Sequence, residues 1–212
     1  MKINKLGHCC FVAEPKEGVR IMTDPGAFST MQSEAKNIST ILITHEHQDH
    51  LHIDSLKKVL VNNPKAIIIT NTAVGKFLTE AGIKYIKVED SQKYNLNGVS
   101  IVGFGNKHAE IYGSYGQVQN TGYMIDSLCY AGDAFSSPNS KVDILALPVA
   151  GPWMRIKDAV DYAKNLKPRI AFPVHDAFIH DWAAFIWRGP ENFLNEAGIK
   201  FKKLELGKEE DL

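Results

Sequence analysis

One short segment of this 212-residue chain decides its fold and chemistry: Thr44-His45-Glu46-His47-Gln48-Asp49-His50. It places three imidazoles and a carboxylate within seven residues, directly after the apolar run Ile41-Leu42-Ile43. Neutral imidazole and ionised carboxylate are the usual ligands of zinc and its neighbouring divalent metals, so the segment indicates a metal site. Side chains two residues apart lie on the same side of an extended loop. His45 and His47 can therefore bind one ion together, which leaves Asp49 and His50 for a second.

The same spacing excludes a helical zinc-protease site. That motif needs a second histidine four residues after the first, and Asp49 occupies this position. The segment therefore predicts a metal site built on a loop after a strand.

Composition places the chain among ordinary globular proteins. Hydrophobic residues make up 44% of the sequence, and residues 1–212 are expected to form a single domain around one core. No apolar run approaches the roughly 20 residues of a membrane span, and the segment after Met1 lacks the apolar stretch of a secretory signal. We therefore expect a cytoplasmic protein without membrane contact. The 24 basic and 24 acidic residues balance, which argues against long nucleic acids as partners. The sequence leaves a homo-oligomer open.

The three cysteines are too few for a disulfide framework. Cys9 and Cys10 are adjacent and poorly placed to pair with each other. We expect both, and Cys129 on a later apolar run, to be small apolar residues of buried strands.

Apolar periodicity and turn residues predict alternating strands and helices. Helices are expected from Ile53 to the stop at Asn62-Asn63-Pro64, and over residues 72–81, 155–166 and 190–197. Strands are expected over residues 2–6, 10–14, 19–23, 66–70, 84–88, 99–104, 117–125, 128–131, 143–148, 169–174 and 199–206. This order is typical of sheets covered by helices.

Five apolar strands each lead to an Asp or His just beyond their C-terminal end. In layered α/β folds such strand ends share one edge, and that edge binds ligands. We therefore expect these five side chains to lie close together: Asp24, His45, His108, Asp133 and His175.

The order of these residues resembles that of the metallo-β-lactamase-fold hydrolases. Their pattern is His-x-His-x-Asp-His, then a single His, a Gly-Asp pair at a strand end, and Pro-x-His. It is met here by His45, His47, Asp49 and His50, then His108, Gly132-Asp133 and Pro173-Val174-His175. Leu6-Gly7-His8 and Thr23-Asp24-Pro25 also resemble the subgroup that includes L-ascorbate-6-phosphate lactonase.

The resemblance implies an α/β fold, a four-layer αββα sandwich, with a dinuclear centre at one edge of its paired sheets. It further implies two divalent ions, with zinc the first expectation and manganese or iron the alternatives. By analogy the first ion is held by His45, His47 and His108, the second by Asp49, His50 and His175, and Asp133 bridges them.

Departures from better-known members narrow the expected chemistry. Zinc β-lactamases with two ions commonly carry Cys at the position of Asp133, which disfavours antibiotic hydrolysis. Flavodiiron oxygen reductases carry Glu at the position of His47 and an additional flavin domain. The long arm with which tRNA 3′-processing enzymes grip RNA has no counterpart in the sequence.

Several polar residues near the motifs have two interpretations. Asp24 either orients a ligand histidine or forms a turn before Pro25. His8 either lines the site or is a structural histidine. Tyr112 and Tyr115 follow His108 among glycines and either line the pocket or form a surface turn.

The remaining candidates lie outside the expected ligand set. His52 and His180 are expected to be surface or packing residues. Trp153 either walls the site or belongs to the core. Arg155 and Arg188 are candidate contacts for an anion, against solvated surface charge as the alternative.

The expected mechanism is hydrolysis of an ester, lactone or phosphodiester bond in a small anionic substrate. Two ions that share a water lower its pKa from 15.7 to about 7 and supply a bridging hydroxide. Asp133 bridges the ions, and Asp49 also accepts the proton of the nucleophile. His8 is one candidate for the leaving-group acid, beside Tyr112 and Tyr115.

Two alternatives stay open. One is a nuclease or cyclic-nucleotide phosphodiesterase on the same centre. The other is a metal-binding protein without turnover, such as a sensor or assembly factor. The second is disfavoured because a structural site needs only four closed ligands and no bridge.

Overall fold

Two seven-stranded mixed sheets face each other in the computed structural model, which describes residues 1–183 and 185–212. The first sheet has the order β14 (Glu209–Asp211), β1 (Lys2–Lys5), β2 (Phe11–Lys16), β3 (Val19–Thr23), β4 (Thr40–Leu42), β5 (Ile67–Thr70) and β6 (Ile86–Lys87). The second has the order β13 (Lys200–Phe201), β12 (Ile170–Val174), β11 (Ile144–Pro148), β10 (Leu128–Tyr130), β9 (Gly122–Ile125), β8 (Val99–Phe104) and β7 (Lys93–Leu96).

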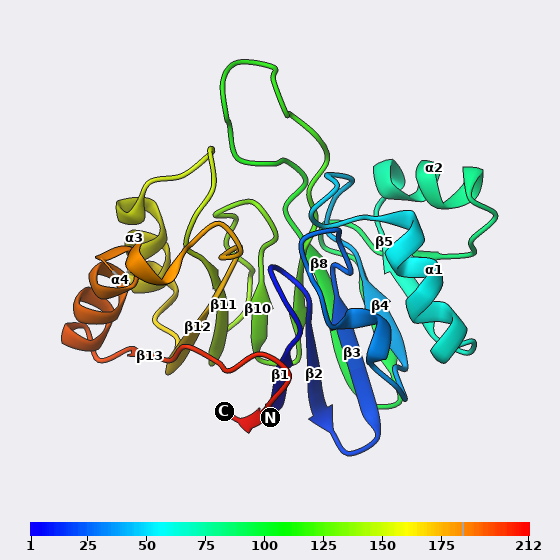
Figure 1. The fold of residues 1–212 in the computed structure, drawn as a ribbon, viewed down its shortest axis with the longest axis horizontal. Helices are drawn as coiled ribbons and strands as arrows, with labels where there is room; N and C mark the ends of the chain where they lie inside the picture. Colours follow the sequence, from blue (N-terminus) through cyan, green and yellow to red (C-terminus); the bar gives the residue numbers. More distant parts are fainter. Residues whose placement is uncertain (184) are drawn as a thin grey trace.

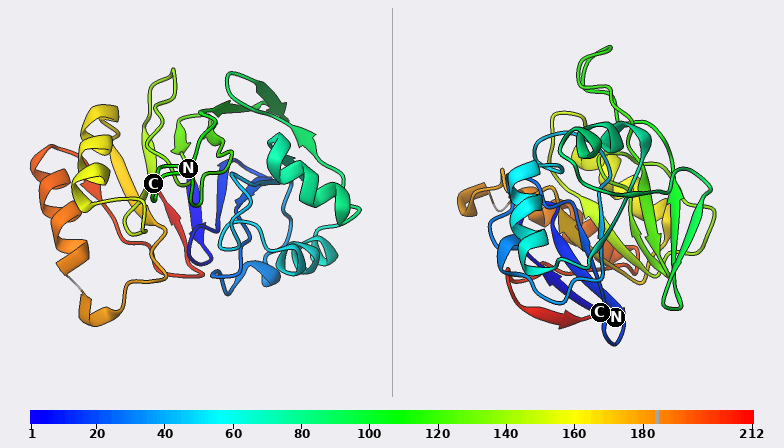
Figure 2. Two further views of the ribbon diagram at one scale, coloured as in Figure 1. Left: turned by 90° about the horizontal axis from the view of Figure 1, so that it is seen from above. Right: turned by 90° about the vertical axis from the view of Figure 1, so that its right-hand side faces the viewer.

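Helices cover the outer face of each sheet (Figures 1 and 2). α1 (Ile53–Asn62) and α2 (Thr72–Glu80) pack on the first sheet, and α3 (Ile156–Leu166) and α4 (Phe185–Glu196) on the second. Two short 3-10 helices, η1 (Gln32–Glu34) and η2 (Asp181–Ala183), lie in connections. The prediction of an αββα sandwich is confirmed.

Three buried clusters correspond to the three contacts between layers. The central one joins the inner faces of the two sheets, with Phe11 of β2 packed edge-to-face on Phe172 of β12 at 5.2 Å between ring centroids. An outer cluster fills the space under α1 and α2, and another the space under α3 and α4. Alternate strand residues thus face opposite layers, as a sheet buried on both faces requires.

Each sheet is antiparallel at one end and parallel at the other. β3, β4, β5 and β6 run parallel in the first sheet, and β10, β11, β12 and β13 in the second. The C-terminal ends of the parallel strands therefore meet along one edge, where the motif residues follow. A long connection between β8 and β9 projects beyond this edge, as the green loop in Figure 1 shows.

Most predicted elements are present within a residue or two of the expected bounds. The expected strand over 117–125 is shorter, because residues 117–121 form a connection whose Asn120 and Thr121 bond to neighbouring loops. The helix expected over 190–197 begins earlier, at Phe185, and contains Pro190. Burial of Trp187 against the second sheet outweighs the helix-breaking tendency of that proline.

The end of the chain differs more from expectation. The closing strand predicted over 199–206 is only Lys200–Phe201, and β14 follows at Glu209–Asp211. β14 pairs antiparallel with β1, so the two termini lie side by side (Figure 1). Neither β14 nor β7 has a long apolar run, which is why the sequence pattern missed both. In residues 1–183 and 185–212, no helix has the length and apolar character to traverse a lipid bilayer.

Candidate metal centre

The His-x-His-x-Asp-His motif forms a loop after β4 that packs on the residues following β3. The backbone amides of Asp24 and Ala27 bond to the carbonyls of Leu42 and Gln48, at 2.9 Å each. Gly26 lies so close beneath the loop that a Cβ at this position would meet the Asp49 carbonyl oxygen at 1.9 Å. A glycine is therefore required there, and the Asp-Pro-Gly segment supports the motif from below.

All seven predicted ligand residues converge at the sheet edge. They form two groups, each with ligand atoms within 4.8 Å of one another: His45, His47 and His108 in the first, and Asp49, His50, Asp133 and His175 in the second. The motif loop supplies four of the seven, and the other three come from the ends of separate strands in the second sheet.

The Asp133 carboxylate lies between the two groups. Its Oδ2 atom is 3.4 Å from His108 Nε2 and 2.9 Å from His175 Nε2, and its Oδ1 atom is 3.1 Å from His50 Nε2. His45 Nε2 is 3.9 Å from Oδ2. One carboxylate thus lies within 4 Å of histidines from both groups.

Asp24 orients two of the histidines from a fully buried position. His50 Nδ1 donates to its Oδ2 atom at 2.7 Å, so His50 Nε2 is left for the site. The Thr44 hydroxyl also donates to Oδ2 at 2.7 Å and accepts from His45 Nδ1 at 3.0 Å. The Tyr130 hydroxyl and the Thr44 amide complete the partners of the carboxylate. Such outer contacts fix the tautomer and direction of a ligand imidazole.

Sequence reasoning predicted this role for Asp24 but missed Thr44 and Tyr130. Tyr130 lies inside an apolar strand with no polar neighbour in sequence, so only the facing of the two sheets shows its function. Thr44 directly precedes the motif, so its hydroxyl beside the second ring nitrogen of His45 was the signal closer to hand in the sequence.

The second sheet's ligand loops are tied to one another. His108 Nδ1 donates to the Ala109 carbonyl at 2.5 Å, which directs Nε2 to the site. The Ala109 amide donates to the Asp133 carbonyl at 2.8 Å. Asn120 accepts from the Asp133 amide at 3.1 Å and donates to the Ala131 carbonyl. Asn120 is a further positioning residue that the sequence pattern did not show.

Gly132 is the residue at which the Asp133 loop packs most closely on Asn120. Its φ is +65°, and a Cβ there would meet Asn120 Oδ1 at 2.4 Å. The Gly-Asp pair is thus a structural requirement, since another residue would displace the Asp133 loop.

His8 supports Asp49 through a defined tautomer. The Ala177 amide donates to His8 Nδ1 at 3.1 Å, so the proton lies on Nε2, which donates to Asp49 Oδ2 at 3.3 Å. Burial lowers the pKa of His8 despite the hydrogen bond to Asp49, so the ring is neutral at neutral pH. Both ring nitrogens are engaged, which makes His8 a positioning residue for Asp49.

The first group of histidines favours the neutral imidazole. Burial lowers the pKa of His45 well below its usual value, and the neighbouring His50 adds to this effect. Burial likewise lowers the pKa of His47, with His108 as the next contribution. A neutral ring is the form that binds a metal.

The second group has the opposite balance. Burial is the largest influence on His50 and His175 and would lower their pKa, but Asp133 and the neighbouring acidic groups together outweigh it, raising the pKa of His175 to about 10 and that of His50 well above its usual value. Burial opposes ionisation of Asp49, yet the close approach of His175 and the hydrogen bond from His8 hold its pKa below the usual range. The ionised carboxylates of Asp49 and Asp133 therefore stabilise a positive charge at the second group, either a protonated histidine or a bound cation.

Unpaired nitrogens show that the residues fit a metal. Nε2 of His45, His50, His108 and His175 is buried without a hydrogen-bond partner of acceptable geometry among the described residues. A buried polar atom without a partner is costly, and here four aim at the space around Asp133. Divalent ions would satisfy these nitrogens and take the place of the protons that the carboxylates otherwise hold on His50 and His175.

An open cavity of about 170 Å³ leads to this centre. Its polar wall consists of candidate ligands, and its other wall of apolar side chains: Phe28, Ile111, Pro152, Trp153 and Phe178. Trp153 lies 5.9 Å from His108 and 5.7 Å from His175 between ring centroids, so it walls the site as one interpretation predicted. Phe28, Ile111 and Phe178 were not singled out by sequence reasoning.

Other candidates lie away from the centre. His52 Nδ1 bonds to Ser55 at 2.8 Å at the start of α1, and His180 stacks on Trp182. Tyr112 and Tyr115 are 84% and 73% exposed on the projecting loop and do not belong to the cavity wall. The structure therefore does not support either tyrosine as a leaving-group acid.

Arg155 is the N-cap residue of α3; its guanidinium donates two hydrogen bonds to Asp158 and is exposed, as the alternative of a solvated surface charge predicted. The expectation for Cys9 needs correction in detail. Cys9 is buried, as expected, but it is more than a filler of a strand. Its sulfur lies within 4.8 Å of ligand atoms of His8, His50 and His175.

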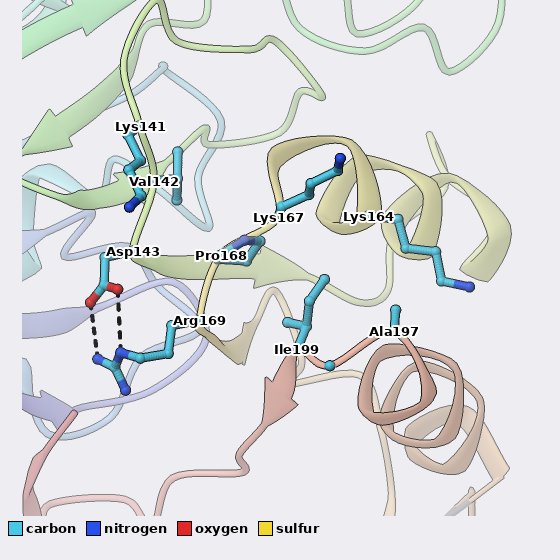
Figure 3. A pocket seen from close by; sticks show the side chains of 10 residues that line it. Lys141, Val142, Asp143, Lys164, Lys167, Pro168, Arg169, Ala197 and Ile199 are labelled. Carbon is cyan, nitrogen blue, oxygen red and sulfur yellow. Dashed lines mark hydrogen bonds and ion pairs between the residues drawn. The ribbon is translucent and has the colours of Figure 1, made fainter.

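A second cavity, of about 730 Å³, lies at the opposite edge of the second sheet (Figure 3). Its walls include the residues that precede β11, β12 and β13, whereas His175 follows β12. Four basic side chains line this cavity: Lys141, Lys164, Lys167 and Arg169. Arg169 forms an ion pair with Asp143. This cavity is separate from the candidate metal centre.

Fold and site together define a metallo-β-lactamase-like protein, and the comparison with known families agrees. Residues 2–175 match the family described as the β-lactamase superfamily domain. The chain therefore belongs to this superfamily, and the matched range ends at the last predicted ligand, His175.

Three individual similarities extend over nearly the whole chain. Protein Rv0786c of Mycobacterium tuberculosis is 33% identical over 195 residues, covering 89% of this chain and 90% of its own. A UPF0173 metal-dependent hydrolase of Pyrococcus abyssi is 28% identical over 235 residues, covering 100% and 99%. The solved structure of Igni18, a metallo hydrolase from Ignicoccus hospitalis, has a TM-score of 0.76 at 22% identity, covering 98% and 96%. The last similarity concerns the fold alone.

Proposed function

We propose that this protein is a metal-dependent hydrolase with a dinuclear centre that cleaves an ester, lactone or phosphodiester bond. The observation that carries the proposal is the position of Asp133 between two groups of histidines whose inward nitrogens have no other partner in the described residues. A site for one structural ion needs four closed ligands and no shared carboxylate. The name of the Pyrococcus abyssi relative, a metal-dependent hydrolase, supports the same conclusion.

The chain's own residues prepare the site for this chemistry. Two bound divalent ions would supply hydroxide at neutral pH by lowering the pKa of a shared water to about 7. Asp24 holds the Nδ1 proton of His50, and His8 holds Asp49 through its Nε2 proton. Asp49 is 17% exposed and borders the cavity, and its lowered pKa keeps it ionised, so its carboxylate can accept a hydrogen bond from the attacking water there. The apolar wall limits access of bulk water to the reacting bond.

Metal binding and turnover must be tested together. The purified full-length chain is first depleted of metal with a chelator and then titrated with zinc or manganese. Elemental analysis is expected to show saturation near two ions per chain. Hydrolysis of lactones, aryl esters and phosphodiesters should appear only after metal is added. Saturation at one ion contradicts the dinuclear centre, and two bound ions without hydrolysis of any class contradict the enzymatic function.

The nuclease alternative gains no support from the cavity. A volume of about 170 Å³ is below the roughly 300 Å³ at which pockets for drug-sized ligands begin. A small substrate, or a small part of a larger one, fits better. The proposed small anionic substrate would place its negative charge at the reacting group, beside the residues that would hold the ions.

A further inference from the structure

The wall of the cavity at the candidate metal centre consists of one set of polar side chains and one set of apolar side chains. Every polar side chain of its wall is a candidate ligand, and the other five wall residues are apolar. No lysine or arginine that the structure describes belongs to this wall. A substrate would therefore meet positive charge only at the ions, next to the bond that reacts.

Two aromatic rings form one side of the entrance. Phe28 and Phe178 lie 5.7 Å apart, edge to face, and their centroids lie 5.7 and 5.0 Å from that of His8. They are 44% and 47% exposed, although both are large apolar side chains. Trp153 supplies a buried ring among the ligands, beside His108 and His175. Exposed aromatics on the rim of a concave site are typical of ligand contact.

Several of the chain's cations have partners or positions away from this cavity. Lys5 is buried but bonds to the Pro173 carbonyl and pairs with Asp176. Arg155 pairs with Asp158 at the start of α3. The cluster of Lys141, Lys164, Lys167 and Arg169 lines the cavity at the opposite edge of the sheet (Figure 3). None of these charges is available to a substrate at the metal centre.

The size of the cavity sets the size of the group that it holds. An apolar cavity of about 150 Å³ binds benzene in other proteins. At about 170 Å³, the cavity here accommodates one ring or a short alkyl chain beside the reacting group.

We propose that the substrate carries a neutral apolar group, a single aromatic ring or a short alkyl chain, next to its scissile bond. The group lies against Phe28 and Phe178 at the entrance and reaches toward Trp153. This inference rests on the proposed hydrolase function and specifies its substrate class. Negative charge, where the substrate has any, is confined to the atoms at the ions.

The first experiment compares matched substrates with the metal-loaded full-length protein. Lactones, aryl esters and aryl phosphodiesters each carry a butyl or phenyl side group, or the same group ending in a carboxylate several bonds from the scissile bond. The neutral member of each hydrolysed pair is expected to have a kcat/KM at least about 10-fold higher. Each methylene added up to butyl is expected to raise kcat/KM about 4-fold, the value for burial of one methylene. An equal or reversed preference overturns the inference and leaves the hydrolase function standing.

The second experiment assigns the preference to the aromatic entrance. Phe28→Ala and Phe178→Ala are expected to raise KM for the neutral substrates about 10-fold, with kcat nearly unchanged, because each removes part of the apolar contact. The matched controls are Phe77→Ala in α2 and Phe193→Ala in α4, which are 44% and 50% exposed and lie outside the cavity wall. Phe178→Leu, which keeps an apolar wall, should retain most of the preference.

A charge introduced at the entrance gives the sharpest outcome. Phe178→Arg is expected to reverse the preference in favour of the carboxylate substrates. If both alanine variants keep the wild-type ratio of neutral to charged kcat/KM, the proposed contact is wrong. Absence of hydrolysis in all three classes by the wild type, with two ions bound, overturns the hydrolase function and this inference with it.

Discussion

The two groups of candidate ligands differ in what holds them. The first group, His45, His47 and His108, contacts Asp24 only indirectly, through the Thr44 hydroxyl, and is otherwise supported by a backbone carbonyl. The second group, with Asp49, His50 and His175, is supported by the buried carboxylate of Asp24 and by His8.

Electrostatics follow the same division. The pKa of His45 and His47 is lowered by burial, while the pKa of His50 and His175 is raised, against burial, by Asp133. Protons therefore compete with a metal mainly at the second group. Two adjacent groups of candidate ligands can thus be prepared in different ways, with Asp133 lying between them.

The largest effect is expected from removing that coupling. Asp133→Ala should lower kcat/KM by at least about 100-fold and weaken binding of both ions, since each group loses its shared carboxylate. His52→Ala and His180→Ala are the controls, because neither side chain touches the centre. Steady-state kinetics and elemental analysis measure the outcome. Comparable losses in either control would show that the wrong histidines have been assigned.

A smaller and more selective effect is expected at Asp24. Asp24→Asn removes the charge that fixes the Nδ1 proton of His50, and it should weaken metal binding about 10- to 100-fold. The weaker of two binding steps in a chelator competition should change most. Tyr130→Phe removes only one donor to Asp24 and should have a smaller effect. Unchanged metal affinities in Asp24→Asn would mean that the hydrogen bond from His50 to Asp24 does not contribute to metal binding.

The stability of the metal-free protein should depend on pH through the second group. The pKa of His175 is about 10 when folded, against 6.5 for the ordinary value that holds in the unfolded chain. Its protonated form therefore stabilises the fold fully below pH 6.5, and this contribution is lost as the pH rises through 10.

Urea unfolding in the presence of a chelator measures this contribution. The free energy of unfolding should fall between pH 7 and pH 10 more steeply in the wild type than in His175→Gln. His180→Gln should keep the wild-type slope, because His180 is exposed. Equal slopes in the wild type and His175→Gln would show that the pKa of His175 is not raised in the folded protein.

The smallest effect is expected at the thiols beside the second group. Cys9→Ser combined with Cys10→Ser should leave kcat/KM within about 3-fold, since hydrolysis by metal-activated water needs no thiol. Metal content and circular dichroism serve as controls for folding. A large loss of activity with metal content unchanged would assign Cys9, which lies close to His50 and His175, a direct part in the reaction.

Local signals were sufficient for most of the fold. Strands such as Val19–Thr23 and Val99–Phe104 have the predicted bounds because their apolar runs and turn residues are unambiguous. The strand expected over 117–125 was too long, because apolar Val118 adjoins polar residues whose partners lie on other loops. The Pro190 signal was misleading for α4, since packing of Trp187 extends the helix before it.

The sequence by itself predicted the candidate ligand residues: the spacing on one loop indicated two pairs, and the family resemblance implied the other three residues and the division into two groups. It also indicated that Asp24 orients a histidine. Only the tertiary structure decided which atoms carry that orientation, through Thr44, Tyr130 and Asn120, and which rings form the entrance. Phe28 follows β3 in one sheet and Phe178 follows β12 in the other, so their contact depends on how the two sheets face each other, which no local pattern encodes.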